Sequence, residues 1–514
     1  MSRKLTLVLA ATAAWGGPAS AEVSRAEILS TYADIAEAGY ADSLGSAKAL
    51  ASAVDALIAD PSAETLAAAR LAWMQARVPY QQTEAFRFGN AIVDDWEGKV
   101  NSWPLDEGLI DYVDQSYGDA TDENQLAALN VIANPSLSLS GKTVDASDIT
   151  PALLEGALHE AGGIEANVAT GYHAIEFLLW GQDVNGTDAG AGNRPWTDFA
   201  TGDACTGGNC DRRGEYLSAA TELLVSDLSW MAEQWGQDGA ARTALTEDET
   251  AGLSAILTGM GSLSYGELAG ERMRLGLMLN DPEEEHDCFS DNTANSHFYD
   301  GLGIRNVYLG SYMRTDGSVV DGASVYDLLA ESDPVLAEEL KTKLDTSVLA
   351  LDRVKIASEA GLGYDQMLAR GNDAGEALVM TAIDALVDCA TDLPPAQSRV
   401  ASMVAIEHLG GAISRVGERD TAFSHRDAQY SCLVLSVCRD RGESEQHIQW
   451  ARNVWDAMRP FLAEGVYVNY LGEDEGEARV KAAYGPNYER LMAVKKKYDP
   501  TNFFHLNQNI KLTV

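Results

Sequence analysis

The amino-acid sequence predicts a mainly α-helical protein that ends in a small α+β piece. The first part of the chain holds long Ala- and Leu-rich segments with helix-start signals, whereas residues 399–514 alternate strand-like and helix-like segments. Charge divides the chain at the same place, because residues 399–514 carry 15 basic and 15 acidic side chains. The whole net charge of −41 therefore belongs to residues 1–398. At 514 residues the chain is too long for one ordinary core, so we expect two or more domains.

The N-terminus has the features of an export signal. Arg3-Lys4 is a basic region, residues 5–15 form a short apolar run, and Ala19-Ser20-Ala21 is a small-residue cleavage site. The apolar run is too short to span a bilayer permanently, and no later run of about 18 apolar residues follows. We therefore predict a signal peptide at residues 1–21. The mature chain is expected in the periplasm or cell envelope, without a transmembrane segment.

Helix signals recur through the first part of the chain. Ser24-x-x-Glu27 and Thr246-x-x-Glu249 have the form of capping boxes, and Asp60-Pro61 places a cap before a proline. Ala- and Leu-rich segments predict the helices themselves, at Glu64–Gln75, Pro151–His159, Tyr216–Gln234 and Val335–Leu351. Long helices joined by polar loops predict helix-on-helix packing, in one bundle or a pair of bundles.

The end of the chain has a different pattern. Residues 400–406 and 430–437 resemble strands, and residues 444–462 and 477–498 resemble helices. Two prolines, Pro394-Pro395, stand where the charge changes. We therefore predict a helical domain at residues 22–390 and a separate C-terminal piece at residues 391–514.

Charge and cysteines limit the function classes. A strongly acidic surface repels nucleic acid and anionic membranes, and it concentrates cations, so no nucleic-acid partner is expected. The alternative is that the negative charge contributes to solubility alone. Cys205 and Cys210 enclose two glycines that allow the turn of a short disulfide loop, and no second Cys or His pair lies nearby to favour metal binding instead.

The most informative segment runs from Gly171 to Asp183. Residues three apart on a helix share one face, so His173 and Glu176 can converge on one point. An imidazole and a carboxylate placed in this way can bind a first-row transition metal. Two ligands do not complete a site, and a hydrogen-bonded structural pair is the alternative.

The first part of the chain resembles the imelysin-like family, from near Trp73 to about Ala385. Six sequence blocks in the family's order carry the resemblance: Pro79–Phe88, Trp103–Glu107, Gly171-x-His173-x-x-Glu176, Cys205–Arg213, Phe289–Thr293 and Gly303–Gly310. The family includes iron-regulated exported proteins and so-called insulin-cleaving peptidases. The resemblance implies two related helical bundles, an envelope location, and a site built around Gly-x-His-x-x-Glu with a link to iron or another metal.

Carried over by position, His173 and Glu176 are the leading metal ligands, with Glu84 as the third. Asp106 and Glu107 follow as possible cleft residues, although acidic residues near a proline often cap a helix. Asp291 and Asn292 could line the same cleft or cap a loop. The predicted cofactor is a divalent or ferric metal ion, iron or zinc, and envelope iron-transport proteins are the candidate partners.

Proteolysis is the second hypothesis, and no catalytic residue can be assigned for it. A zinc peptidase needs three protein ligands, an open position for water and a general base. The His-Glu-x-x-His motif is absent, because His159-Glu160 is followed by Ala-Gly-Gly, and no Gly-x-Ser-x-Gly motif occurs. We therefore favour a non-enzymatic metal-binding protein over a metallopeptidase. A purely structural bundle is the alternative without function.

The C-terminal piece resembles the end of berberine-bridge-type flavin oxidases. The blocks that carry this resemblance are His408–Gly411, His425–Tyr430, Tyr467–Tyr470, Tyr484–Leu491, Lys497–Phe503 and Asn507–Ile510. In such enzymes the Tyr-x-Asn-Tyr segment approaches the flavin, which would point to Tyr467 and Asn469. The glycine-rich FAD-binding domain that these oxidases need is missing upstream. FAD is therefore not expected, and oxidoreductase activity is the most distant hypothesis.

Overall fold

The computed structural model describes nine stretches of the chain: residues 23–118, 124–139, 141–392, 403–409, 412–435, 444–459, 465–471, 477–506 and 509–511. The predicted signal peptide at residues 1–21 lies outside them. The chain divides into two compact units, Met1–Leu393 and Pro394–Val514. The structure is 65% helical with a few short strands, which confirms the mainly α prediction. No helix among the described residues is long and apolar enough to cross a membrane.

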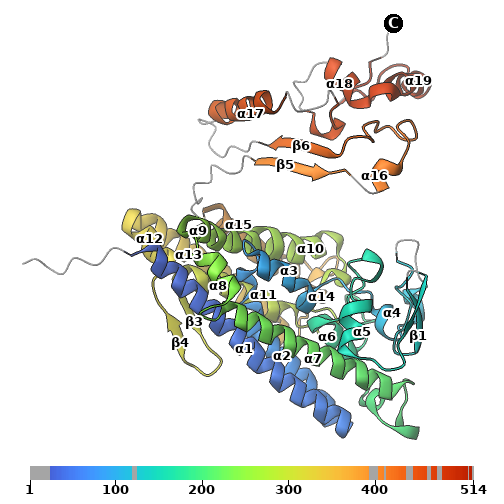
Figure 1. The fold of residues 1–514 in the computed structure, drawn as a ribbon, viewed down its shortest axis with the longest axis vertical. Helices are drawn as coiled ribbons and strands as arrows, with labels where there is room; N and C mark the ends of the chain where they lie inside the picture. Colours follow the sequence, from blue (N-terminus) through green and yellow to red (C-terminus); the bar gives the residue numbers. More distant parts are fainter. Residues whose placement is uncertain are drawn as a thin grey trace, which may run out of the picture. The chain divides into compact units, whose positions relative to one another are not determined.

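The first unit consists of helices and two small hairpins (Figure 1). Its α-helices are α1 (Arg25–Ala59), α2 (Ala63–Gln81), α3 (Ala91–Asn101), α4 (Glu107–Ile110), α5 (Pro151–Leu153), α6 (Gly171–Trp180), α7 (Cys210–Trp235), α8 (Ala240–Thr246), α9 (Glu249–Gly261), α10 (Leu275–Leu279), α11 (Thr293–Leu309), α12 (Val325–Ser332), α13 (Pro334–Glu359), α14 (Tyr364–Leu368) and α15 (Asp373–Asp392). A π-helix, η7 (Ser262–Arg274), joins α9 to α10. The antiparallel hairpins are β1 (Ser136–Leu139) with β2 (Lys142–Asp145), and β3 (Ser311–Met313) with β4 (Val319–Asp321).

The long helices of this unit form two packed groups. In one group α1 packs against both α2 and α7, and α6 contacts α2 and α7. In the other, α13 packs against α11 and α15, and η7 contacts α15 and α11. Helices α2 and α11 touch, so one hydrophobic core continues through both groups. The candidate site lies where α2, α6 and the segment before α11 meet.

Local sequence explains where the first helices begin and end. Ser24 and Glu27 form the predicted capping box at the start of α1. The prediction of Asp60 as the cap of α2 is wrong, because Asp60 ends α1 and the side chain of Ser62 accepts the Thr65 amide.

The predicted Thr246 cap is also wrong. The Thr246 hydroxyl donates back to the carbonyl of Arg242 inside α8, so it is not available to cap the next helix. The Asp248 carboxylate accepts the amides of Thr250 and Ala251 and caps α9 instead. At the start of α7, Cys205 and Cys210 are joined by a disulfide with 6.0 Å between their Cα atoms.

The second unit contains one antiparallel pair of strands among its described residues, β5 (Met403–His408) with β6 (Tyr430–Leu435). Its helices are α16 (Ala412–Arg415), α17 (Ser444–Met458), α18 (Glu477–Tyr484) and α19 (Tyr488–Tyr498). The helix predicted over residues 477–498 is split into α18 and α19, because Gly485-Pro486 interrupts it with a short 3-10 turn. Residues 400–402, 436–437 and 460–462 of the predicted elements lie outside the described part of the chain.

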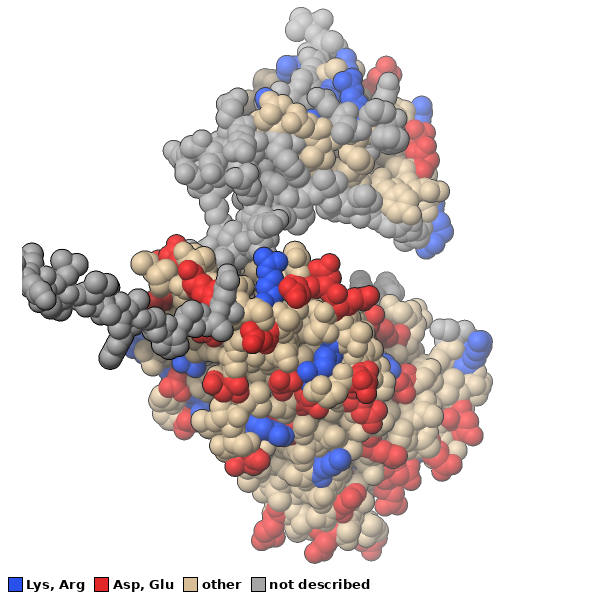
Figure 2. Space-filling view, turned by 60° about the vertical axis from the view of Figure 1, so that its left-hand side comes forward, with Lys and Arg blue, Asp and Glu red and all other residues tan. Residues whose placement is uncertain are grey.

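The surface of the first unit is rich in carboxylates, as its composition predicts. Figure 2 shows Asp and Glu side chains spread over the visible face of this unit, with fewer Lys and Arg side chains among them. This charge distribution favours the approach of cations over that of anions.

Candidate metal centre

Helix α6 lies in the core of the first unit, and each of its ten residues is buried. A helix that is apolar on all sides requires such complete burial. Its first residue, Gly171, has a φ of +82°, and a Cβ at this position would lie 2.4 Å from the carbonyl oxygen of Val100. The glycine of the Gly-x-His-x-x-Glu segment therefore allows the close contact with α3 that sets the position of α6.

Replacing Gly171 by alanine is expected to destabilise the protein by roughly 2–5 kcal/mol, because the new methyl group would clash with the α3 backbone at a strained φ. Gly98→Ala is the matched control, since a Cβ there meets no atom within 4 Å and Gly98 lies inside helix α3. Chemical denaturation of both variants measures the difference. Equal stability of the two variants would contradict this account of Gly171.

His173 and Glu176 face each other on one side of α6. The Nδ1 atom of His173 lies 3.0 Å from Oε2 of Glu176, and both side chains are buried. The other oxygen of Glu176 accepts hydrogen bonds from the Ser290 amide at 3.0 Å and the Ser290 hydroxyl at 2.6 Å. Glu176 is therefore held from two sides, and it in turn orients the ring of His173.

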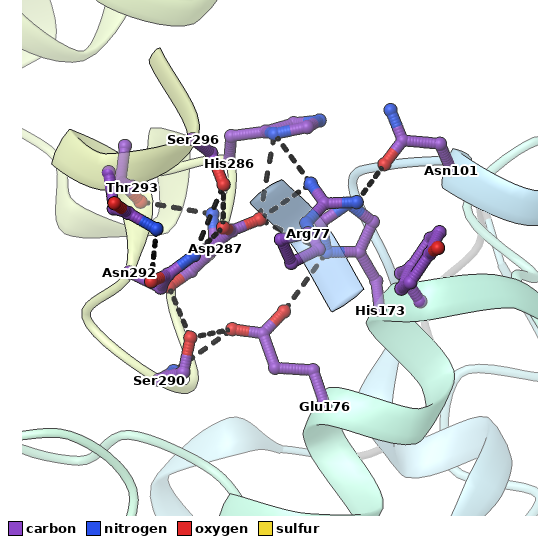
Figure 3. Close-up of polar contacts among 12 residues, drawn as sticks. Arg77, Asn101, His173, Glu176, His286, Asp287, Ser290, Asn292, Thr293 and Ser296 are labelled. Carbon is purple, nitrogen blue, oxygen red and sulfur yellow. Dashed lines mark hydrogen bonds and ion pairs between the residues drawn. The ribbon is translucent and has the colours of Figure 1, made fainter. Parts of the chain in front are cut away.

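A second segment, the connection between η8 (Pro282–Glu284) and α11, brings two further ligand groups to His173. Donor atoms of His173, His286 and Asp287 lie within 4.8 Å of one another, and the three side chains are buried. The rings of His173 and His286 meet edge to face with centroids 4.7 Å apart. Figure 3 shows these side chains gathered around Arg77, with Glu176 below them in the view. We call His173, His286 and Asp287 the His-His-Asp cluster.

Neighbouring side chains fix the carboxylate of Asp287. Its Oδ2 atom accepts hydrogen bonds from Asn292 at 2.8 Å and from the Ser296 hydroxyl, and its own amide donates to the Thr293 hydroxyl at 3.0 Å. Asn292 was predicted as a cleft residue, and in the structure it positions Asp287. The first turn of α11 thus holds one oxygen of Asp287 and leaves Oδ1 directed toward Arg77 and His173.

Arg77 on α2 supplies a buried positive charge next to the cluster. Its guanidinium lies 2.8 Å from Oδ1 of Asp287, 3.3 Å from Nδ1 of His286 and 2.6 Å from Oδ1 of Asn101. It also stacks over the ring of Tyr172, 5.0 Å from the centroid. Arg77 is thereby the counter-charge of Asp287 in this structure.

Burial sets the protonation states of the cluster. Burial and the charge of Arg77 lower the pKa of His173 to about 3, and burial lowers the pKa of His286 well below its usual value. Burial alone would raise the pKa of Asp287, but the adjacent Arg77 guanidinium holds it below its ordinary value. The cluster therefore presents two neutral imidazoles and one ionised carboxylate, the forms in which these side chains bind metals.

Glu176 behaves differently from Asp287. Burial and the charge of Asp287 raise the pKa of Glu176 well above its usual value. The hydrogen bonds from Ser290 oppose this rise only in part. Glu176 therefore supports His173 as a hydrogen-bond partner, while Asp287 carries the negative charge of the cluster.

The structure places Glu84 in a different group from His173. Glu84 pairs with Arg272 at 2.8 Å, and Arg272 also contacts Glu267 and Asp300. Asn101 links the two groups, because its amide donates to Glu84 at 3.4 Å and its oxygen accepts from Arg77. Glu84 is thus committed to a buried ion pair next to the cluster.

The three remaining acidic candidates lie outside the His-His-Asp cluster. Asp106 precedes α4 and accepts hydrogen bonds from Tyr117 at 3.1 Å and from Asn124, which is a loop-fixing role. Glu107 lines a separate pocket, where burial raises its pKa to about 7. Asp291 has a φ of +57°, and burial followed by the charge of Asp365 raises its pKa to about 7.

Sequence reasoning missed the groups that complete the cluster. His286 and Asp287 stand in the run Glu283–Cys288, directly before the Phe289–Thr293 block, and a His-Asp pair at the edge of a recognised block was the available signal. Ser290 lies inside that block, yet no feature of spacing connects it with Glu176. Arg77 offered no signal, because it lies outside the predicted helix Glu64–Gln75 and a lone arginine is normally exposed.

The comparison with family models decides the relationship. The imelysin model matches residues 36–393, which is more than half of the chain. The chain belongs to the imelysin family. This imelysin also shares its fold with a crystal structure described as a precursor of iron-regulated protein A from Parabacteroides distasonis. The TM-score is 0.54 at 20% identity, and the match covers 74% of this chain and 96% of the other.

The C-terminal segment of this imelysin has other relatives. The model described as berberine and berberine like matches residues 466–511. An FAD-linked oxidoreductase of Dictyostelium discoideum is 30% identical over 29% of this chain and 31% of its own length. Berberine bridge enzyme-like 23 of Arabidopsis thaliana is 34% identical over 20% of this chain and 23% of its own length. The chain thus spans less than a third of these curated relatives.

Tyr467 and Asn469 lie on the surface of the second unit. The Asn469 amide donates to the Tyr467 hydroxyl at 2.8 Å, and the Tyr467 ring packs against Phe423 and Tyr470. These contacts hold the two side chains together within their own unit.

Proposed function

We propose that this imelysin is an exported protein that binds a metal ion, iron or zinc, at the His-His-Asp cluster and serves metal uptake or handling in the envelope. The observation that carries the proposal is the convergence of His173, His286 and Asp287, three buried side chains with donor atoms within 4.8 Å of one another. They come from segments more than 100 residues apart, so local sequence alone does not account for their meeting.

The donor set fits these metals. Two imidazoles and one carboxylate suit Fe(II) and Zn(II). Among the described residues, no hydrogen-bond partner reaches Nε2 of His173, although this atom is buried. A buried imidazole nitrogen normally has a partner, so this atom is a free donor position. Glu176 holds Nδ1 of His173, which lies 4.0 Å from Oδ1 of Asp287, and so keeps the imidazole next to that carboxylate.

Proteolysis fits the geometry less well. A metallopeptidase needs a carboxylate free to take a proton from the bound water. Both oxygens of Glu176 are engaged, one with His173 and the other with Ser290. Arg77 and Asn101 occupy the side of the cluster opposite Glu176. We therefore favour binding and delivery of a metal, with envelope iron-transport proteins as partners. The name of the Parabacteroides relative, iron-regulated protein A precursor, supports iron.

Metal content tests this function. Full-length protein is purified, measured by mass spectrometry as isolated, stripped with chelator, and reloaded with Fe(II) or Zn(II). We expect one tightly held ion per chain in the wild type and none in His173→Ala. Wild-type protein that takes up no stoichiometric metal in any form would refute the proposal. Cleavage of a denatured protein substrate that disappears in His173→Ala would instead support the peptidase.

A further inference from the structure

A second group of carboxylates lines a small pocket on the first unit. The residues that line it are Glu107, Asp183, Gly186, Pro282, Glu283, Glu285, Cys288, Phe289 and Asp365. We call this the acidic pocket. Four separate segments contribute to it: the start of α4, the loop after α6, the segment before α11, and α14. None of its described lining residues is basic.

Two of these carboxylates are buried without a hydrogen bond. Glu285 is 1% exposed and Asp365 is 2% exposed, and no described donor hydrogen-bonds to either oxygen of either side chain. The Thr293 side chain lies near Glu285 and the Gln366 amide lies near Asp365, but neither completes a hydrogen bond to these carboxylates. Buried carboxylates normally have partners, so both groups lack a ligand that would compensate them.

The other lining carboxylates add to the same negative field. Burial raises the pKa of Glu107 to about 7 and the pKa of Asp365 to about 6. Glu283 has its pKa raised by burial and then by the charges of Asp281 and Asp183. Asp183 differs, because its Oδ1 atom accepts hydrogen bonds from Asn185. Carboxylates that repel one another in a half-buried site are stabilised when a cation lies between them.

The acidic pocket is distinct from the His-His-Asp cluster, since none of the three cluster residues lines it. Cys288 lies between the two sites. Cys288 lines the acidic pocket and directly follows Asp287 of the cluster in the chain. Each site can therefore be tested without disturbing the ligands of the other.

We propose that the acidic pocket is a second cation site, which binds a partly hydrated Ca²⁺ through Glu285 and Asp365, with Glu107 and Glu283 completing its negative field. Oxygen donors without nitrogen favour a hard cation over a transition metal. Among the described residues, no three carboxylates of the acidic pocket converge within 4.8 Å of one another, so water would supply most of the ligands of a bound ion. An ion with six to eight oxygen ligands that include water fits such a spacing.

Calcium titration of the chelator-treated full-length protein tests this site. Isothermal titration calorimetry at about 0.15 M salt screens weak surface binding. We expect one saturable site per chain, weakened at least about tenfold in Glu285→Gln and in Asp365→Asn and lost in the double variant. Because removing a buried charge relieves repulsion, the two variants should be no less stable than the wild type without calcium.

Two controls separate this site from other effects. A double variant of exposed residues, Asp238→Asn with Glu247→Gln, changes the net charge equally and should retain the calcium site. His286→Ala should also retain it, which distinguishes a failure here from a failure of the metal-binding proposal. A wild type with no saturable calcium binding, or undiminished binding in Glu285→Gln with Asp365→Asn, would overturn the inference.

Discussion

Replacing Arg77 by methionine is expected to lower the free energy of unfolding of the metal-free protein by about 3–5 kcal/mol. Arg77 is fully buried and pairs with Asp287 at 2.8 Å. Methionine keeps much of the side-chain volume among Trp73, Tyr80 and Tyr172 but leaves the Asp287 carboxylate buried without its counter-charge. The loss of the pair, rather than a cavity, therefore dominates the effect.

Metal is expected to reverse this loss. With Arg77 absent, Oδ1 of Asp287 no longer has a competing partner, so the metal affinity of Arg77→Met should rise roughly ten- to hundredfold. A ligand at about 1,000 times its Kd adds about 4 kcal/mol to stability. Thermal unfolding of Arg77→Met, with Zn(II) or with chelator, should therefore show a larger metal-dependent shift than the wild type shows.

Arg213→Met is the matched control for this experiment. Arg213 is also buried, and it pairs with Asp111 at 2.6 Å, away from the cluster. We expect a smaller destabilisation, because Arg194 still pairs with Asp111 at 2.7 Å, and no greater response to metal than in the wild type. An Arg77→Met protein whose stability ignores metal, while the wild type still binds it, would show that Asp287 is not a ligand.

The sequence could predict the part of the site that is local. His173 and Glu176 are three residues apart in an otherwise largely apolar segment, so helix geometry alone brings their side chains together. Gly171 was visible as part of the same motif. The need for a glycine at this position was not visible, because the carbonyl that a side chain would meet belongs to Val100 on another helix. The spacing of residues along the sequence indicates which side chains share a face of one helix, but it does not indicate which residues of other helices lie next to them.

The part of the site that comes from distant segments could not be predicted without the fold. His286 and Asp287 reach His173 because α6 and α11 both pack against α2 and because the first turn of α11 holds Asp287. Glu84 shows the converse case. Its position in a matching block suggested a ligand, yet the π-helix η7 brings Arg272 within 2.8 Å of its carboxylate. Whether a buried acid binds a metal or a guanidinium depends on long-range partners that a single sequence does not contain.

His286→Ala is expected to reduce metal affinity more than Glu176→Gln does. His286 donates directly to the proposed metal, whereas Glu176 acts through the hydrogen bond to Nδ1 of His173. Loss of an outer hydrogen-bond partner typically costs about 10- to 100-fold in metal affinity, and loss of one of three direct ligands should exceed this range. Competition with a chromophoric chelator measures both affinities on the same scale.

His297→Ala is the control that removes packing as an explanation. His297 is a buried imidazole whose ring meets Tyr364, with centroids 5.2 Å apart, and it lies outside the His-His-Asp cluster. Its loss creates a cavity like that of His286→Ala, so both variants should be destabilised to a similar degree. If metal affinity fell equally in the two variants, the effect would come from weakened packing. A fall confined to His286→Ala would come from a lost ligand, because both variants lose a buried imidazole of the same size.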